Sequence, residues 1–395
     1  MRILSNMRAE LAYVLINPYT ISKSRTGGVL GRIIAWTQLD LVGARMFGPG
    51  KELVEAYAQL VEADPGLRPD EAVNLSRYVR RAYAPASDGR RRRVMMLVFA
   101  GEGAVEKIRR VAGSVRHNTE SARTVRDIYG DFIVDDKGEV VYIEPAIMVG
   151  ESPEAAEKGL KLWAAFSESD GGMIENTVDL PRGQPPEKTL VLIKPDNFRE
   201  PSVRPGSIID IFSGSGLRII CAKVHRMSVA EAMQFYAPVR DVLEKRLRDG
   251  VKQRAAVCLQ QEFGLRVAGD VAQRISEVLT PVYAEWQFNQ IVHFMTGVWP
   301  ADCAAERRRE PGKERCLALV YAGKSAVNVI RDILGPTDPK SARPGSVRRQ
   351  FGRDVMVNAA HASDSPARAQ QEMEIIRVAE DTIRSLVERA YGPVV

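Results

Sequence analysis

The sequence predicts an α+β protein of two tandem domains, each a ferredoxin-like (split βαβ) fold with an antiparallel sheet. An internal repeat is the first observation behind this prediction: residues 97–109 align with residues 319–331, and residues 14–18 align with residues 191–195. The second observation is that apolar strands and helices follow one another in the same order in both copies. A long internal repeat of this kind indicates two copies of one folding unit.

Each copy is expected to start with a short apolar strand, a helix that opens on glycine, and a second strand. Another helix, ending near Tyr57 or Tyr236, comes before a third strand, its helix and a fourth strand. Two β-α-β halves with helices on one face form a split βαβ sheet. The main expected elements are residues 11–17, 28–36, 39–47, 94–99 and 103–111 in the first copy, and residues 189–194, 206–213, 217–227, 315–321 and 325–334 in the second.

The domain boundaries follow from the repeat and from local composition. Residues 1–166 hold the first copy, and residues 188–395 hold the second. Residues 167–187 between them are polar and rich in glycine and proline, which is typical of an exposed linker.

The two copies differ in two places. The second copy carries an insertion at about residues 241–286, whose apolar residues are spaced as in two helices. This insertion is either a lid or an assembly arm. In the first copy, residues 132–143 alternate in polarity around Asp136-Lys137-Gly138, which predicts a β-hairpin.

Composition indicates a soluble protein of the cytoplasm. Of the 395 residues, 45% are apolar and 27% are charged, a normal globular balance. The four cysteines form no C-x-x-C pair and have no histidine at ligand spacing, so neither a disulfide framework nor a zinc site is expected. The longest apolar run near the start, residues 11–16, is too short for a signal segment or a membrane span.

The net charge of +6 is concentrated in arginine runs at residues 77–81, 90–93 and 307–309. Such runs could bind nucleic acid or another polyanion. Solvated helix ends and a loop explain them more simply, and no aromatic residues interleave with them as in a stacking platform for single strands. A nucleic-acid partner is therefore possible but not favoured.

One histidine, His361, precedes a small polar turn and an expected helix over residues 367–386. Asp364 or Ser365 could cap that helix, and Pro366 suits its first position. Because a helix N-terminus attracts anions, phosphate oxygens would bind favourably beside the imidazole. An imidazole can act as nucleophile, acid or base near neutral pH. By itself, however, a lone histidine at a strand–helix junction is more often structural.

Four motifs in register with His361 resemble the nucleoside diphosphate kinase family. They are Lys194-Pro-Asp196 at a strand end, Gly335-Pro-Thr337-Asp-Pro339, the segment 343–352, and Asn358-x-x-His361-x-Ser-Asp-Ser365. The resemblance covers residue 188 to about residue 380, apart from the insertion. It departs from the family pattern at Ala362, where the family has glycine.

The resemblance implies the family's activity and its catalytic residues. His361 would take the terminal phosphate of a nucleoside triphosphate and pass it to a nucleoside diphosphate, in ping-pong covalent catalysis. Glu372 would hold the other ring nitrogen, Lys194 would reach the transferred phosphate, and Tyr236 would lie against the histidine.

The resemblance also implies a nucleotide site. Arg331 and Arg348 would clamp the phosphates, and Asn358 would bind the ribose 3′-hydroxyl. Thr337 would add a hydroxyl group. Phe288 is the candidate for stacking on the base, with Trp286 as its rival. Mg²⁺ would arrive bound to the phosphates rather than in a metal site made by the protein.

The first copy lacks most of these residues and is expected to be catalytically dead. A thioether cannot carry a phosphate in this chemistry, so its role would be structural, as a partner of the active copy. Its two retained arginines are relic or surface charges, or they still bind a phosphate. The resemblance implies a homo-oligomer. The aligned residues are Asn17, Val115, Pro145, Met148 and Gly159, with Arg109 and Arg126 retained.

Two functions from different classes remain. The leading prediction is an Mg²⁺-dependent nucleoside diphosphate kinase. The alternative is a non-catalytic regulatory or assembly protein that kept the fold and binds nucleotides. The complete set of motif residues around His361 favours the kinase. The alternative is motivated by the insertion, the dead first copy, and Gln287-Phe288, which stands where the family has an aromatic pair beside the base.

Overall fold

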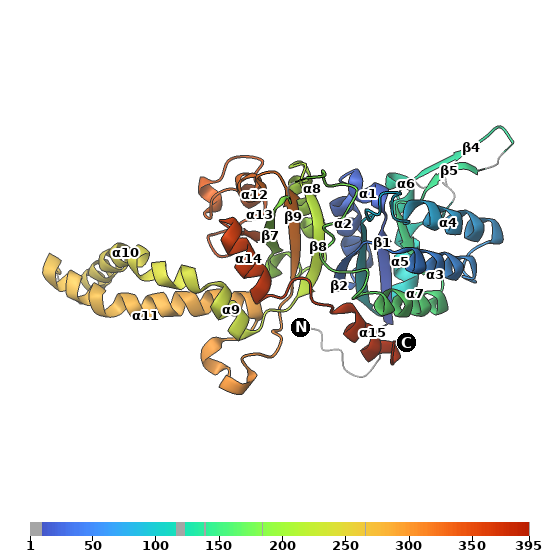
Figure 1. Cartoon of the computed structure of the whole chain (residues 1–395). Helices are drawn as coiled ribbons and strands as arrows, with labels where there is room; N and C mark the ends of the chain where they lie inside the picture. Colours follow the sequence, from blue (N-terminus) through green and yellow to red (C-terminus); the bar gives the residue numbers. More distant parts are fainter. Residues whose placement is uncertain (1–9, 116–122, 138–139, 184, 265, 395) are drawn as a thin grey trace. The chain divides into compact units, whose positions relative to one another are not determined.

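The computed structural model describes residues 10–115, 123–137, 140–183, 185–264 and 266–394 (Figure 1). The chain forms two compact units. One combines Met1–Val224 with Leu317–Val395, and the other is His225–Cys316. Each unit is described below by itself.

The first sheet has the strand order β2-β3-β1-β6. Its pairs β1–β3, β2–β3 and β1–β6 are all antiparallel. This order, with the first strand between the third and the last, is that of the expected ferredoxin-like fold. The strands are β1 (Glu10–Ile16), β2 (Asp40–Phe47), β3 (Val94–Gly101) and β6 (Ile147–Val149).

Helices cover both faces of this sheet, not one face as expected. Side chains alternate across β1, so that Val14 and Ile16 pack with α2 and α5, while Tyr13 and Leu15 pack with α3, α4 and α7. Because β1 is apolar at every position after Glu10, it requires cover on both sides. The helices are α1 (Pro18–Ser22), α2 (Thr26–Thr37), α3 (Lys51–Glu62), α4 (Pro69–Ala82), α5 (Ala104–Ala112), α6 (Val125–Tyr129) and α7 (Pro153–Ala165).

The second sheet repeats this topology with the order β10-β7-β9-β8. Strands β10–β7 and β7–β9 pair antiparallel. The fold class predicted from the repeat is therefore confirmed. The strands are β7 (Glu187–Ile193), β8 (Arg218–His225), β9 (Cys316–Gly323) and β10 (Ala360–Ala362). The helices are α8 (Arg204–Ser213), α12 (Ala326–Leu334), α13 (Val347–Phe351), α14 (Pro366–Ile375) and α15 (Ile383–Tyr391), with short 3₁₀ turns at Pro195–Asn197 and Pro339–Ser341. Two further 3₁₀ turns, Pro300–Asp302 and Ala305–Arg307, belong to the second unit.

The single helix expected over residues 367–386 was wrong, because the segment forms α14 and α15 with a break between them. Ser365 caps α14 by accepting a hydrogen bond from the Arg368 backbone N–H, and Pro366 takes its first position, as expected. The chain then leaves the helix at Arg377, whose φ of +46° is left-handed. Asp381 starts α15 by accepting a hydrogen bond of 2.8 Å from the Ile383 backbone N–H.

Equivalent helices of the two copies, α2 and α8, pack against each other within the first unit. Their contact is too close for side chains at two glycines: a Cβ on Gly206 would lie 2.1 Å from the Gly27 carbonyl oxygen. Asp210 of α8 accepts a hydrogen bond of 3.0 Å from the Gly28 backbone N–H. The two copies thus meet through the same helix on each side.

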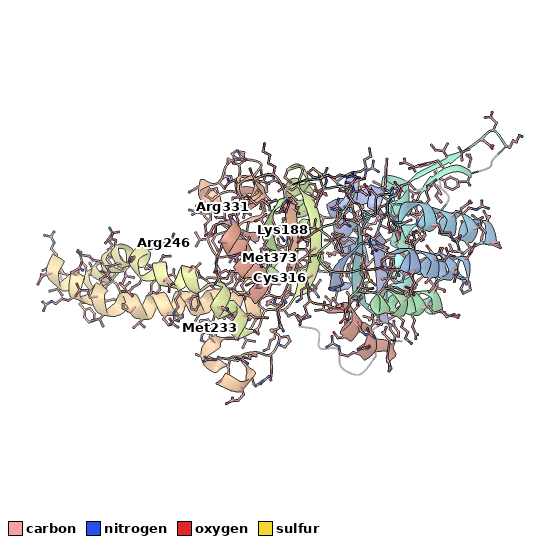
Figure 2. The ribbon with its side chains drawn as sticks, in the orientation of Figure 1. Lys188, Met233, Arg246, Cys316, Arg331 and Met373 are labelled. Carbon is pink, nitrogen blue, oxygen red and sulfur yellow. The ribbon has the colours of Figure 1, made fainter. Side chains whose placement is uncertain are left out.

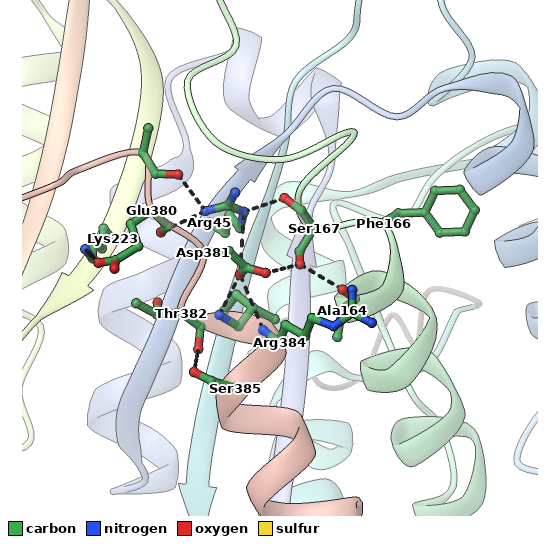
Figure 3. A network of polar contacts seen from close by, with 12 residues as sticks. Arg45, Ala164, Phe166, Ser167, Lys223, Glu380, Asp381, Thr382, Arg384 and Ser385 are labelled. Atoms are coloured by element: carbon green, nitrogen blue, oxygen red, sulfur yellow. Dashed lines mark hydrogen bonds and ion pairs between the residues drawn. The ribbon is translucent and has the colours of Figure 1, made fainter. Parts of the chain in front are cut away.

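A polar network ties the C-terminal segment of the chain to the first sheet (Figure 3). Arg45 on β2 donates hydrogen bonds to the backbone carbonyls of Ser167 and Glu380. Asp381 accepts a hydrogen bond from the Ser167 hydroxyl and pairs with Arg45. Helix α15 then packs against α7 and β2.

The second unit is dominated by the helical hairpin of α10 (Ala237–Phe263) and α11 (Gly269–Thr296), preceded by α9 (Val229–Phe235). The two helices predicted for the insertion are confirmed. They meet along small side chains of α11, including Ala272, Ser276 and Thr280. Within this seam the Ser276 hydroxyl donates to the Arg248 carbonyl at 3.0 Å.

The β-hairpin predicted in the first copy is present as β4 (Asp131–Val134) and β5 (Val140–Glu144). Gly138 of its expected turn lies outside the described residues. Across the part of the chain that the structure describes, no helix has the length and apolar character that crossing a membrane requires.

Candidate functional site

His361 is the middle residue of the short edge strand β10, where it pairs with Leu192 on β7. It was expected at the junction after a strand, but the structure places it within the strand. Ala359, the residue directly before β10, is buried and has a left-handed φ of +70°. The Ala359 carbonyl accepts a hydrogen bond of 2.9 Å from the Lys194 backbone N–H. A strained residue next to a chemically active side chain is common at functional sites.

A buried carboxylate holds the imidazole. Glu372 Oε2 lies 2.9 Å from His361 Nε2, with 2% of the Glu372 side chain and 21% of the His361 side chain exposed. The Ser363 hydroxyl donates to the same Oε2 at 2.7 Å, and Arg368 pairs with Oε1 at 3.1 Å. Burial by itself raises the pKa of Glu372, but the charge of His361 and the hydrogen bonds outweigh it, so the pKa is lower than usual.

This arrangement determines which ring nitrogen can react. A carboxylate with a low pKa is ionised near neutral pH and accepts the proton of Nε2. The neutral imidazole then has its lone pair on Nδ1. The carboxylate would also stabilise a positive charge that develops on the ring.

Lys194 and Asn358 are joined at the end of β7. Lys194 Nζ donates to Asn358 Oδ1 at 2.6 Å and to the Met356 carbonyl at 3.1 Å. Burial, with a further contribution from the nearby Arg348 charge, lowers the pKa of Lys194 to about 7. Binding of an anion would therefore relieve an unfavourable buried cation.

Arg348 braces the strand that carries His361. Its guanidinium donates to the Ala360 carbonyl at 3.2 Å and to the Gly335 carbonyl at 2.9 Å. Asn358 Nδ2 donates to the Thr337 carbonyl at 3.1 Å, which joins this loop to the same cluster. Arg331 is exposed on α12 (Figure 2), a helix that packs against β7 and β10.

Tyr236 and Phe288 belong to the His225–Cys316 unit, so their placement near His361 stays a prediction. Within that unit Phe288 is buried, and the Arg240 guanidinium lies 5.4 Å from its ring centroid. Trp286 is 43% exposed and stacks on Tyr283.

The first sheet has different chemistry at the matching positions. Met148, 1% exposed, pairs with Leu15 as His361 pairs with Leu192. Asn17 lies two residues beyond Leu15, as Lys194 lies beyond Leu192, and it is buried between Glu144 and the Tyr83 hydroxyl. Tyrosines and a tryptophan fill the space around these residues: Tyr13, Tyr57, Tyr78, Tyr83 and Trp163.

The two arginines retained in the first copy are engaged in ion pairs. Arg126 pairs with the buried Glu151 at 2.7 Å and donates to the Gly113 carbonyl at 2.6 Å. Arg109 pairs with Glu106 on the surface of α5 at 2.9 Å. These contacts favour the structural interpretation of both arginines over phosphate binding.

Sequence reasoning missed Ser363 and Arg368, which complete the shell of Glu372. Ser363 could have been found from the strand period, because residues two apart point to the same face. Arg368 lies four residues before Glu372 on α14, a spacing at which helical side chains meet. Among the described residues, no group of three or more His, Cys, Asp or Glu side chains could hold a metal ion.

The fold and the site define a class: split βαβ proteins with an edge-strand histidine held by a buried glutamate, and with a buried lysine at the end of the neighbouring strand. The family model described as "Nucleoside diphosphate kinase" matches residues 187–245 and 312–381. In its C-terminal half the chain is thus similar to the nucleoside diphosphate kinase family.

Curated relatives show the same similarity. The nucleoside diphosphate kinase of Bdellovibrio bacteriovorus is 29% identical over 189 residues, covering 48% of this chain and 91% of the relative. That of Pyrobaculum aerophilum is 28% identical over 203 residues, covering 48% of this chain and 93% of the relative.

Two solved structures are also similar in sequence. The Aquifex aeolicus nucleoside diphosphate kinase is 28% identical, with 48% of this chain and 94% of that chain covered and a TM-score of 0.30. An NDP kinase from Pyrobaculum aerophilum is 24% identical, with 50% and 100% covered and a TM-score of 0.33. At these TM-scores the structural likeness adds nothing to the sequence match.

Proposed function

We propose that the chain is a nucleoside diphosphate kinase whose chemistry takes place in its C-terminal half. The observation that carries this proposal is the contact of 2.9 Å between His361 Nε2 and Glu372 Oε2. A glutamate buried to 2% exposure and held by Ser363 and Arg368 is costly unless its charge has a partner. The partner is the imidazole of His361. Because its Nδ1 lone pair stays free, this imidazole can act as the nucleophile in phosphoryl transfer.

In the first half-reaction His361 Nδ1 attacks the terminal phosphorus of a nucleoside triphosphate. The bond from that phosphorus to the bridging oxygen breaks, and the diphosphate leaves with the electron pair. In the second half-reaction a terminal oxygen of another nucleoside diphosphate attacks the same phosphorus, and the N–P bond breaks. Glu372 keeps the ring oriented and balances its positive charge in both steps.

The cations of the site would position the phosphates. Lys194 and Arg348 lie near each other at the ends of β7 and α13, so both can reach a phosphate chain above β10. Arg331 would extend the clamp from α12, and guanidinium groups suit bidentate phosphate contacts. Asn358 would receive the ribose 3′-hydroxyl, and Thr337 would contribute its own hydroxyl.

The magnesium complex of the nucleotide would be the substrate. The described residues offer no carboxylate cluster for a resident metal, and Mg²⁺ commonly binds through substrate phosphates. The protein's part is then to hold the phosphate oxygens with Lys194, Arg331 and Arg348.

The first copy would be catalytically inactive and would act as the folding partner of the second. Met148 replaces the nucleophile, Gly159 replaces Glu372, and a Cβ on Gly159 would lie 2.5 Å from the Tyr13 ring. The position is therefore closed to a carboxylate as well as lacking one. The packing of α2 on α8 supports the structural role.

A two-step transfer experiment tests this function. The full chain is incubated with γ-labelled ATP and Mg²⁺, isolated, and then mixed with GDP. We expect an acid-labile, base-stable label that moves to GTP. A label that forms but stays on the protein would point to a phosphohistidine regulator. Binding of ATP without any label would favour the non-catalytic assembly protein.

The arginine runs give little support to a polyanion-binding scaffold. Arg80 pairs with Glu55 and Glu62, and Arg93 pairs with Asp179. Partnered guanidinium groups form a weaker electrostatic footprint for nucleic acid. DNA binding that fell steeply with salt would restore this function.

A further inference from the structure

Helix α11 carries two stripes of side chains, an inner one of small residues that packs against α10 and an outer one of apolar residues. The inner stripe is small and buried, with Ala272, Ser276, Thr280 and Ala284 spaced four residues apart. The outer stripe has larger side chains and faces solvent; Val278 is 76% exposed and Val282 is 66% exposed. The outer stripe consists of Val271, Ile275, Val278, Leu279, Val282 and Trp286.

The outer stripe is one continuous face. At 3.6 residues per turn, its six residues fall within an arc of about 100°. Single exposed apolar residues need no explanation, but a contiguous apolar patch marks an interaction surface. Helix α11 and most of α10 also lie between the two segments that match the family model, residues 187–245 and 312–381.

The spacing of the stripe identifies its partner. From residue 271 to residue 286 the steps between apolar residues are 4, 3, 1, 3 and 4, which read the same from either end. A two-fold axis between residues 278 and 279 therefore maps the stripe onto itself in the antiparallel direction. Such self-complementarity is what an isologous contact between two identical chains requires.

The charges beside the stripe obey the same symmetry. Arg274 and Glu285 lie on the same side of the helix face. Across the two-fold axis, Arg274 of one copy comes level with Glu285 of the second copy to within two residues, about 3 Å along the helix. Within one chain Arg274 pairs with Asp270 at 3.5 Å and Glu285 pairs with Arg240 at 2.9 Å, and the opposite charge of the second copy would extend these pairs at the rim.

We propose that α11 docks on α11 of a second copy of this chain, antiparallel, so that two hairpins form a four-helix bundle. Val271 then lies opposite Trp286, Ile275 opposite Val282, and Val278 opposite Leu279. The insertion is an assembly arm in this arrangement. This proposal is independent of phosphoryl transfer.

Cysteine cross-linking tests the geometry. The full chain first receives Cys258→Ser and Cys303→Ser, which remove its accessible thiols. Leu279→Cys next to the axis should give a disulfide-linked pair of chains under mild oxidation. Val271→Cys alone should not, because the two thiols would be about 22 Å apart along the helices. Mixing the Val271→Cys chain with a Trp286→Cys chain should restore the cross-link.

A charge substitution tests the association itself. Light scattering on the purified chain should give at least twice the mass of one chain. Val278→Asp with Val282→Asp should halve that mass, while Val141→Asp, at an exposed valine of β5, should leave it unchanged. Circular dichroism checks that the variants remain folded. Three results would each overturn the proposal: a monomeric wild-type chain, an assembly whose mass is unchanged by Val278→Asp with Val282→Asp, or cross-linking of Val271→Cys with itself.

Discussion

Met148 occupies in the first sheet the position that His361 occupies in the second. Met148 pairs with Leu15 on β1, and His361 pairs with Leu192 on β7. An alanine with a left-handed φ lies two residues before each of them, Ala146 before Met148 and Ala359 before His361. Each alanine carbonyl accepts a backbone hydrogen bond from the residue that follows β1 or β7. One backbone thus presents a thioether in one copy and an imidazole in the other, and the proposed division of labour rests on this difference.

The first prediction separates the two copies. His361→Ala should abolish the phosphoenzyme and lower kcat by about 10³-fold or more. Met148→Leu, which conserves volume in a buried position, should leave turnover nearly unchanged, and so should Met148→Ala at a temperature where the chain stays folded. Labelling with γ-phosphate and steady-state kinetics measure both. Equal damage from the Met148 and His361 substitutions would refute the division of labour.

The second prediction asks whether the first copy can be reactivated. Met148→His in a His361→Ala background should give no phosphoenzyme. The residue is 1% exposed, and Gly159 offers no carboxylate to hold a ring nitrogen. The measurement is the same labelling experiment, with the His361→Ala chain as the baseline. A base-stable label on the double variant would show that the first copy still admits a nucleotide.

The third prediction concerns Glu372 and pH. Its folded pKa lies below the usual 4.5, so its charge contributes stability that is present above pH 4.5 and lost as pH falls through the folded pKa. Glu372→Gln should therefore destabilise the chain most near neutral pH and least in acid. It should also slow phosphoenzyme formation by about 10- to 100-fold, because the ring loses its counter-charge.

Urea unfolding between pH 3 and pH 7 measures the stability part. Glu374→Gln, an exposed glutamate on the same helix, is the matched control. A stability loss for Glu372→Gln that did not change with pH would contradict the ion pair with His361 and Arg368.

The fourth prediction concerns proton uptake at Lys194. Its pKa of about 7 leaves most of the lysine neutral at pH 8. Phosphates bound beside it would raise that pKa, so ADP binding at pH 8 should take up as much as about one proton. Calorimetry in two buffers of different ionisation enthalpy counts the protons. Lys194→Met should remove the uptake, whereas Lys188→Met, on the same strand, should keep it.

The fold was predictable because the repeat and the apolar periods agree. Two features of the fold were not predicted from the sequence: helices cover both faces of the first sheet, and the C-terminal helix is broken. The first follows from strands such as β1, whose continuous apolar run does not reveal which helices will cover each side. The second depends on Arg377 and Asp381, where a left-handed residue and a side-chain cap override a helical pattern.

The site was predictable only in part. The motifs located His361, Glu372, Lys194 and Asn358. In the structure His361 contacts Glu372, and Lys194 contacts Asn358. They could not reveal that Lys194 donates to Asn358, because this contact depends on how β7 and the loop before β10 meet. They also could not place Tyr236 or Phe288 relative to His361, since these two residues flank the long insertion and belong to the His225–Cys316 unit.

The last prediction tests the contact between the copies. Gly206→Ala should lower the free energy of unfolding by about 1–3 kcal/mol, because its Cβ would meet the Gly27 carbonyl oxygen at 2.1 Å and the Gly31 backbone nitrogen at 2.6 Å. Gly214→Ala, next to the same helix with its nearest contact at 3.4 Å, should change stability by less than about 0.5 kcal/mol. Denaturant unfolding compares the two. If both substitutions were neutral, α2 and α8 would not pack closely in solution, and the first copy would have lost its role as the structural partner of the second.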